Sequence, residues 1–108
     1  MLSPSSNCPL TPCIKLLSGA WTLEILYYLQ IAPLRFGELR KRLGKVSSKV
    51  LTNRLRDLET KRVISRKEIP TNPISVEYSL AEVGYELLPV LETLSEVSQV
   101  INHKFQIS

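Results

Sequence analysis

The sequence predicts a mainly α-helical fold with a small β-hairpin, arranged as a winged helix-turn-helix. Three observations lead to this prediction: two helical patterns joined by a glycine turn in residues 36–62, two short strand patterns directly after them, and a concentration of positive charge over the same part of the chain. A hairpin directly after two such helices occupies the position of the wing in this fold. The 108 residues suffice for one modest core, so we expect a single domain.

Composition argues against several classes of protein. No apolar run reaches the roughly 18 residues needed to cross a bilayer, and residues 1–10 lack the features of a signal peptide, so we expect a cytoplasmic protein without a membrane partner. Cys8, Cys13 and the distant His103 do not make a zinc site or a disulfide framework, which leaves redox chemistry or packing for the cysteines. With no phosphate-binding loop or nucleophile cluster, we predict no enzyme activity, cofactor or metal.

The N-terminal part is predicted to support the helix-turn-helix. Residues 1–8 show no apolar period and are expected to form a mobile arm, followed by a DNA-binding domain over residues 9–81. A short helix beginning at Pro9 or Pro12 should end at Gly19, since proline suits a first helical turn and glycine a stop. Residues 21–30 are apolar on most sides, which is typical of a core helix, and residues 32–34 then break the chain.

Residues 36–62 form the predicted helix-turn-helix. Gly44 ends its first helix, and Ser47 or Ser48 offers a side-chain oxygen to the first amides of the second. In the second helix three leucines fall in one stripe: Leu51, Leu55 and Leu58. At about 100° per residue the opposite face carries four polar or basic residues, which we predict to reach base edges in a major groove: Lys49, Thr52, Asn53 and Arg56.

Positive charge is concentrated in residues 35–67. This segment contains twelve Lys or Arg against three Asp or Glu, a net charge of +9, whereas the rest of the chain carries −5. Solvated charges are common on amphipathic helices, but this concentration favours a polyanionic partner because phosphate neutralisation supplies much of nucleic-acid affinity. Contacts to the DNA backbone are predicted for Arg35, Lys41, Arg42, Ser47, Ser48 and Arg54.

Two strands are predicted directly after the second helix. Residues 63–69 are rich in β-branched side chains at their ends, and residues 75–80 alternate apolar and polar side chains. Two prolines and an asparagine in residues 70–73 favour a turn between them. We expect three residues of this wing to lie against the flanking DNA: Lys67, Thr71 and Asn72.

Residues 82–108 are predicted to form a C-terminal dimerisation helix packed on the same domain. Pro89 should bend this helix or mark a change in its packing. Apolar residues repeat at spacings of three and four, close to a coiled-coil seam: Leu87, Val90, Leu94, Val97 and Ile101. Further apolar residues widen the stripe beyond what one small domain needs to cover, so we favour a homodimer over a helix that covers only its own core.

Residues 8–94 resemble the HxlR-type winged helix-turn-helix regulators. The order and spacing of several segments carry the resemblance: Cys8-Pro9, GAWT at 19–22, RFGEL at 35–39, VSSKVLTNRL at 46–55, VEYSL at 76–80 and LLPVL at 87–91. The resemblance implies a bacterial or archaeal regulator that binds palindromic operator DNA as a homodimer, with dimer contacts from the first and last helices. In some relatives the cysteine of the Cys-Pro pair senses electrophiles or oxidants, which makes Cys8 a redox candidate.

The predicted function is a sequence-specific DNA-binding transcriptional regulator acting as a homodimer on double-stranded DNA with an inverted repeat. The alternative is a winged-helix module whose basic face binds a protein or RNA, which the charge pattern alone does not exclude. A footprint on duplex DNA carrying an inverted repeat would separate the two. The sequence indicates neither the target genes nor a small-molecule effector.

Overall fold

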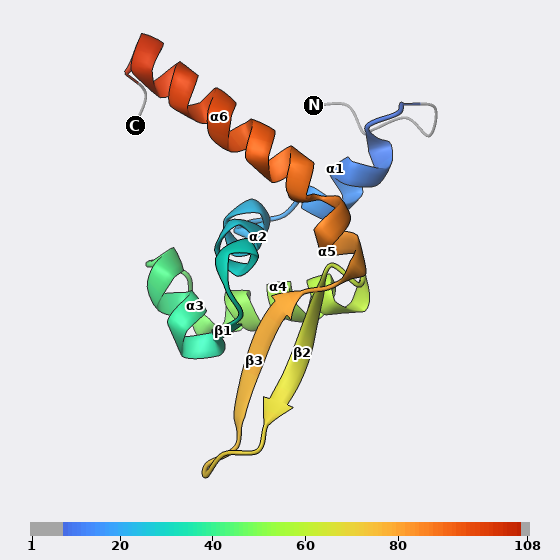
Figure 1. Ribbon diagram of the computed structural model, residues 1–108, viewed down its shortest axis with the longest axis vertical. Helices are drawn as coiled ribbons and strands as arrows, with labels where there is room; N and C mark the ends of the chain where they lie inside the picture. The colour runs from blue at the N-terminus through green and yellow to red at the C-terminus, as the bar shows by residue number, and fades with distance from the viewer. Residues whose placement is uncertain (1–7, 107–108) are drawn as a thin grey trace.

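The computed structural model describes residues 8–106, and its elements follow the order of a winged helix-turn-helix. They are α1 (Thr11–Leu17), α2 (Thr22–Ile31), β1 (Leu34–Arg35), α3 (Phe36–Leu43), α4 (Ser48–Thr60), β2 (Ile64–Ile69), β3 (Ser75–Leu80), α5 (Glu82–Glu86) and α6 (Leu88–Phe105), as Figure 1 shows. The predicted fold class is therefore confirmed. The expected mobile arm, residues 1–8, lies outside the described residues except for Cys8.

One apolar core joins these elements. Ile25 and Leu26 of α2 are completely buried at its centre. The predicted leucine stripe of α4 packs against them, and each of its three members is at most 1% exposed. Because burying a leucine or isoleucine side chain contributes roughly 1.5–3 kcal/mol, this stripe fixes which face of α4 points inward. Tyr27 and Ile31 are exposed, so α2 is buried on one side rather than all round.

The sheet has three antiparallel strands in the order β1-β3-β2. β2 and β3 form the predicted hairpin, in register from Ile64 opposite Leu80 to Ile69 opposite Ser75. The hairpin extends away from the helical body in Figure 1. β1, which pairs through Leu34 and Tyr78, was not predicted, since residues 32–34 were expected only to break the chain. A strand of two residues has no period of its own, and its pairing with β3 is a tertiary contact.

The C-terminal segment is two helices, whereas the sequence predicted one helix with a bend or a change in packing at Pro89. α5 ends at Glu86, Leu87 intervenes, and Pro89 lies in the first turn of α6, where its missing N–H has no intrahelical acceptor to lose. Pro89 therefore starts a new helix instead of bending an existing one. In Figure 1, α6 extends away from the body on the side opposite the hairpin tip. Among the described residues, no helix combines the length and apolar character needed to cross a membrane.

Candidate nucleic-acid interface

Local interactions at the turn between α3 and α4 set the direction of α4. Gly44 ends α3 with φ +89°, a left-handed conformation that side chains disfavour. Ser47 is the N-cap of α4, and its Oγ accepts a hydrogen bond of 3.1 Å from the backbone N–H of Val50. The Arg40 Nε donates to the carbonyl oxygen of Val46 at 3.1 Å, which ties the turn back to α3. Of the two serines considered for the cap, Ser47 is therefore the one that serves.

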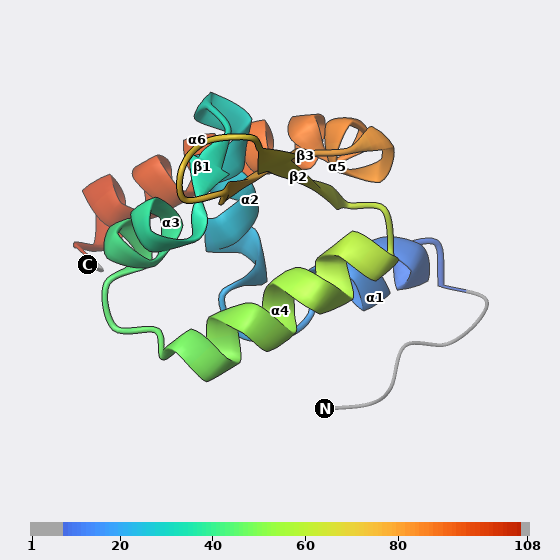
Figure 2. The ribbon, with the colours of Figure 1, turned by 90° about the horizontal axis from the view of Figure 1, so that it is seen from below.

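The outer face of α4 carries the four residues predicted to read bases. Lys49, Asn53 and Arg56 are exposed, and Thr52 is half-buried. Figure 2 shows α4 along one edge of the molecule, with the other elements on its inner side. The helix thus presents a row of hydrogen-bonding side chains on a surface that a major groove can accommodate.

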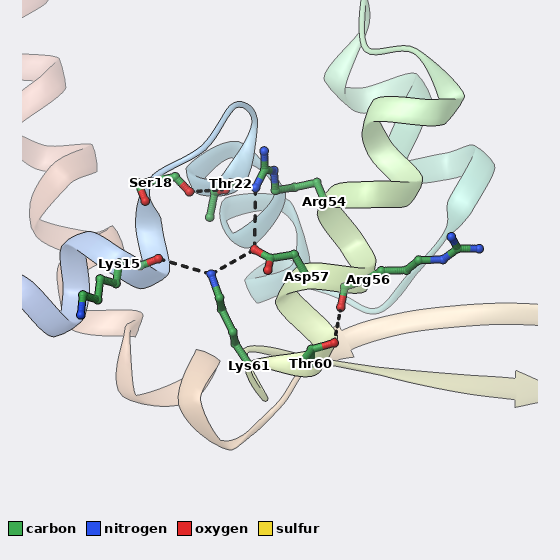
Figure 3. A network of polar contacts seen from close by, with 8 residues as sticks. All are labelled: Lys15, Ser18, Thr22, Arg54, Arg56, Asp57, Thr60 and Lys61. Atoms are coloured by element: carbon green, nitrogen blue, oxygen red, sulfur yellow. Dashed lines mark hydrogen bonds and ion pairs between the residues drawn. The ribbon is translucent and has the colours of Figure 1, made fainter.

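Arg54, predicted to contact a phosphate, points inward instead. Its side chain is only 26% exposed, and its Nη1 lies 3.7 Å from the Oδ2 of Asp57 on the next turn. The Nε atom is buried without a hydrogen-bond partner among the described residues. Figure 3 shows the guanidinium beside the segment from Ser18 to Thr22, whereas Arg56 extends in a different direction. Arg54 is therefore less exposed than the other eleven Lys and Arg residues of residues 35–67, and the predicted backbone contact of Arg54 stays a prediction.

The remaining residues predicted to contact the DNA backbone are exposed. Arg35 lies in β1, Lys41 and Arg42 lie in the last turn of α3, and Ser47 and Ser48 lie at the N-terminus of α4. The free amides and dipole of a helix N-terminus attract phosphate, so the two serines are placed where an anion is favoured.

Two basic residues near these positions were not among the candidates. Lys45 is exposed in the turn between α3 and α4, and Arg66 is exposed on β2. The charge count of residues 35–67 includes both, so composition already contained the signal. Of the twelve Lys and Arg residues in that segment, all except Arg54 are exposed. The positive charge therefore lies on the surface, where it attracts a polyanion.

The wing residues lie on the hairpin, and one of them orders its turn. Lys67, Thr71 and Asn72 are all exposed. The Thr71 hydroxyl lies 2.8 Å from the Pro73 carbonyl oxygen, to which it donates, and 3.2 Å from the hydroxyl of Ser75. Lys67 stands opposite Glu77 in the strand register, so an acidic side chain faces it across the hairpin. The wing therefore offers less net positive charge than α3 and α4.

The surface of α6 is apolar over much of its length. Leu91 is the one buried residue among the 18 of this helix. Leu94, Val97 and Ile101, predicted as interface residues, are 41%, 46% and 40% exposed, while Val90 is half-buried. Leu87, also predicted as an interface residue, is only 3% exposed and belongs to the core of its own domain, so it offers little surface to a second chain.

α1 lies beside the start of α6 in Figure 1. The two helices enclose an apolar groove of about 440 Å³. It is lined by Leu10, Cys13, Ile14, Leu17, Ser18, Val90 and Leu94. The groove therefore continues onto the exposed apolar surface of α6.

Both cysteines are free and half-buried. Cys8 precedes α1, separated from it by Pro9 and Leu10, and its carbonyl oxygen accepts a hydrogen bond of 3.1 Å from the N–H of Thr11. Cys13 packs against the core and lines the groove between α1 and α6. No group of three or more His, Cys, Asp or Glu residues suited to a metal occurs within residues 8–106.

Comparisons with known proteins agree with this geometry. A family model described as HxlR-like helix-turn-helix matches residues 16–104. The chain is 39% identical over 91 residues to the HTH-type transcriptional regulator BH0655 of Halalkalibacterium halodurans, covering 83% of this chain and 80% of that protein.

Two solved structures share the fold. A transcriptional regulator of Porphyromonas gingivalis W83, described as a MarR-family member, superposes with a TM-score of 0.82 at 29% identity, over 92% of this chain and 97% of that one. The redox regulator HypR in its oxidized form gives a TM-score of 0.81 at 29% identity, over 86% and 96%. These proteins are described as regulators rather than enzymes, which agrees with the prediction of no enzyme activity.

Proposed function

Since this chain belongs to the HxlR-like helix-turn-helix family of transcriptional regulators, we propose that it acts as a homodimer on operator DNA that carries an inverted repeat. The observation that carries the proposal is the outer face of α4, which is polar and exposed, is backed by a buried leucine stripe, and lies within a segment of net charge +9. A regulator of this kind works in the cytoplasm, where the DNA is.

In this proposal α4 enters a major groove and reads bases. Arg56 can donate two hydrogen bonds to the O6 and N7 of guanine, and Asn53 can pair with the N6 and N7 of adenine. Lys49 and Thr52 supply further donors on the same face. Each good bidentate pair contributes about 1–3 kcal/mol of discrimination against the wrong base.

The backbone contacts fix the register of α4 on the duplex. Arg35, Lys41 and Arg42 would meet phosphates beside the groove, and the N-terminus of α4 with Ser47 and Ser48 would meet one more. The wing, with Lys67, Thr71 and Asn72, would lie along the flanking backbone or minor groove. These contacts are expected to supply affinity that depends on salt but not on sequence.

The dimer would form through the apolar surface of α6 and the groove beside α1. At 1.5 Å per residue α6 is about 27 Å long, enough for a substantial helix pair. Val90, Leu94, Val97 and Ile101 would pack against their equivalents, since a twofold interface uses the same patch on both subunits. Such a dimer would place its two copies of α4 about one DNA turn, or roughly 34 Å, apart.

Cys8 is the candidate for a redox response. HypR, a structural neighbour, is described as a redox regulator. In the present chain Cys8 is half-buried just before α1, and α1 borders the groove of the proposed dimer interface. An adduct on Cys8 would therefore place a new group next to that interface.

The test compares two alanine variants that differ in the kind of DNA contact they lose. Arg56→Ala should weaken binding to a selected operator by about 1–3 kcal/mol and flatten the base preference at one position. Lys41→Ala should weaken binding to all duplexes alike and lower the slope of log affinity against log salt by about one unit. If both variants lose sequence preference equally, or if wild type prefers RNA or a protein partner to every duplex, the proposal is wrong.

A further inference from the structure

We propose that Arg54 is a positioning residue: its guanidinium, packed on Gly19 and facing Asp57, fixes α4 against the end of α1 and so sets the spacing of half-sites that the dimer accepts. The inference rests on the proposed function, because spacing has a meaning only for a dimer on an inverted repeat. It assigns to Arg54 a role other than contact with DNA.

The guanidinium of Arg54 packs so closely on Gly19 that a side chain on the glycine would have to displace it. A Cβ atom on Gly19 would lie 2.6 Å from Nη1, 2.7 Å from Cζ and 3.0 Å from Nη2 of Arg54. Gly19 also has φ +107°, which side chains rarely adopt. The turn between α1 and α2 is therefore shaped so that it accepts the guanidinium of a residue in α4.

Charges around Asp57 extend this contact to the end of α1, as Figure 3 shows. The Oδ2 of Asp57 lies 3.7 Å from Arg54 Nη1 and 3.1 Å from Lys61 Nζ. Lys61 Nζ also donates to the carbonyl oxygen of Lys15, in α1, at 3.5 Å. Asp57 and Lys61 are partly exposed, so these ion pairs contribute little to stability. Together with the packing of Arg54 on Gly19, they connect the C-terminal half of α4 to α1.

α1 thus contacts both α6 and α4. One side lines the apolar groove with α6, where Leu17 and Leu94 both contribute and where we place the dimer interface. Its C-terminal end meets α4 through Gly19, Arg54 and Lys61. If α4 keeps one orientation relative to α1, the dimer interface determines the distance between the two copies of α4. If that orientation varies, the distance between the two copies varies too.

The experiment compares Arg54→Lys with Arg56→Lys in the full chain. Both substitutions keep the charge and lose the planar guanidinium, but Arg54 faces inward and Arg56 outward. An operator selected with wild type from random duplexes is rebuilt with one base pair inserted or deleted between its half-sites. Each change shifts one half-site by about 3.4 Å and roughly a tenth of a turn. Folding and dimerisation are checked by circular dichroism and sedimentation.

Wild type should lose about tenfold or more in affinity when the spacing changes. Arg54→Lys should keep the base preferences within each half-site, but its affinity should fall by less than about threefold on the altered spacings. Arg56→Lys should change the base preferences but discriminate between spacings as wild type does. Asp57→Asn removes the partner of Arg54 and should discriminate as weakly between spacings as Arg54→Lys. It replaces Arg54→Lys in the experiment if that variant does not fold.

The inference is overturned if a folded, dimeric Arg54→Lys or Asp57→Asn discriminates spacing as wild type does. It is also overturned if Arg54→Lys changes the base preferences, since Arg54 would then contact DNA. Failure of the proposed function would be visible separately, in wild type alone, as an absence of preference for any inverted repeat.

Discussion

Replacing Gly84 with alanine tests how α5 is held against the hairpin. A Cβ at this position would lie 2.2 Å from the carbonyl oxygen of Val63, and at least 3.0 Å is needed, so the backbone must open by about 0.8 Å. The same carbonyl accepts a hydrogen bond of 3.0 Å from the N–H of Ala81. Opening the contact therefore also weakens the junction between β2, β3 and α5.

The expected loss of stability follows from three terms. Forcing a methyl group into a packed site costs about 1–3 kcal/mol, and weakening the Ala81 hydrogen bond costs about 0.5–1.5 kcal/mol. Alanine in a helix regains about 0.5–1 kcal/mol over glycine. The net destabilisation of Gly84→Ala is about 2 kcal/mol, which lowers the Tm of a domain of this size by about 10 °C.

The matched control is Gly37→Ala. A Cβ on Gly37, within α3, meets no atom within 4 Å, so this variant should gain up to about 1 kcal/mol from helix propensity alone. Urea unfolding and thermal scans of the two variants beside wild type measure both effects. Equal stabilities for Gly84→Ala and Gly37→Ala would show that α5 does not pack on Val63 as described.

Three further changes have expected outcomes. Leu94→Glu places a charge in the centre of the proposed interface and should convert the dimer to a folded monomer in sedimentation at micromolar concentration; a dimer that persists would remove α6 from the interface. Ser47→Ala removes the N-cap of α4 and should cost about 1 kcal/mol in urea unfolding, whereas no change would deny the cap a role. Cys8→Ser should keep operator binding after diamide treatment that releases wild type, and unchanged wild-type affinity despite confirmed modification of Cys8 would end the redox proposal.

The sequence predicted those helices and strands that the residue pattern of their own segment specifies. The leucine stripe of α4 is buried at the predicted residues, because burial of one face imposes a period on the chain. β3 forms over the predicted residues 75–80, although its burial does not alternate, since residues 75–79 are all half-buried and Leu80 is buried. The same reasoning did not find β1, whose two residues become a strand only by pairing with β3. It also did not separate α5 from α6, since a helical period can continue across a one-residue break at Leu87.

The inward orientation of Arg54 needed the tertiary structure. From the sequence, Arg54 and Arg56 are two basic residues on one amphipathic helix, and both were predicted to contact DNA. What separates them is the turn between α1 and α2, which brings Gly19 beneath the Arg54 guanidinium. Leu87 was placed in a dimer seam for a similar reason, because its apolar spacing does not reveal which apolar surface it joins.

The most direct test of the proposed function measures how many chains bind one operator. Wild type is titrated onto a duplex with the selected inverted repeat and onto the same duplex with one half-site scrambled, and the complexes are sized by sedimentation. The account predicts two chains on the intact repeat and an affinity lower by about tenfold or more on the scrambled duplex. One chain per duplex, with equal affinity for both, would contradict it.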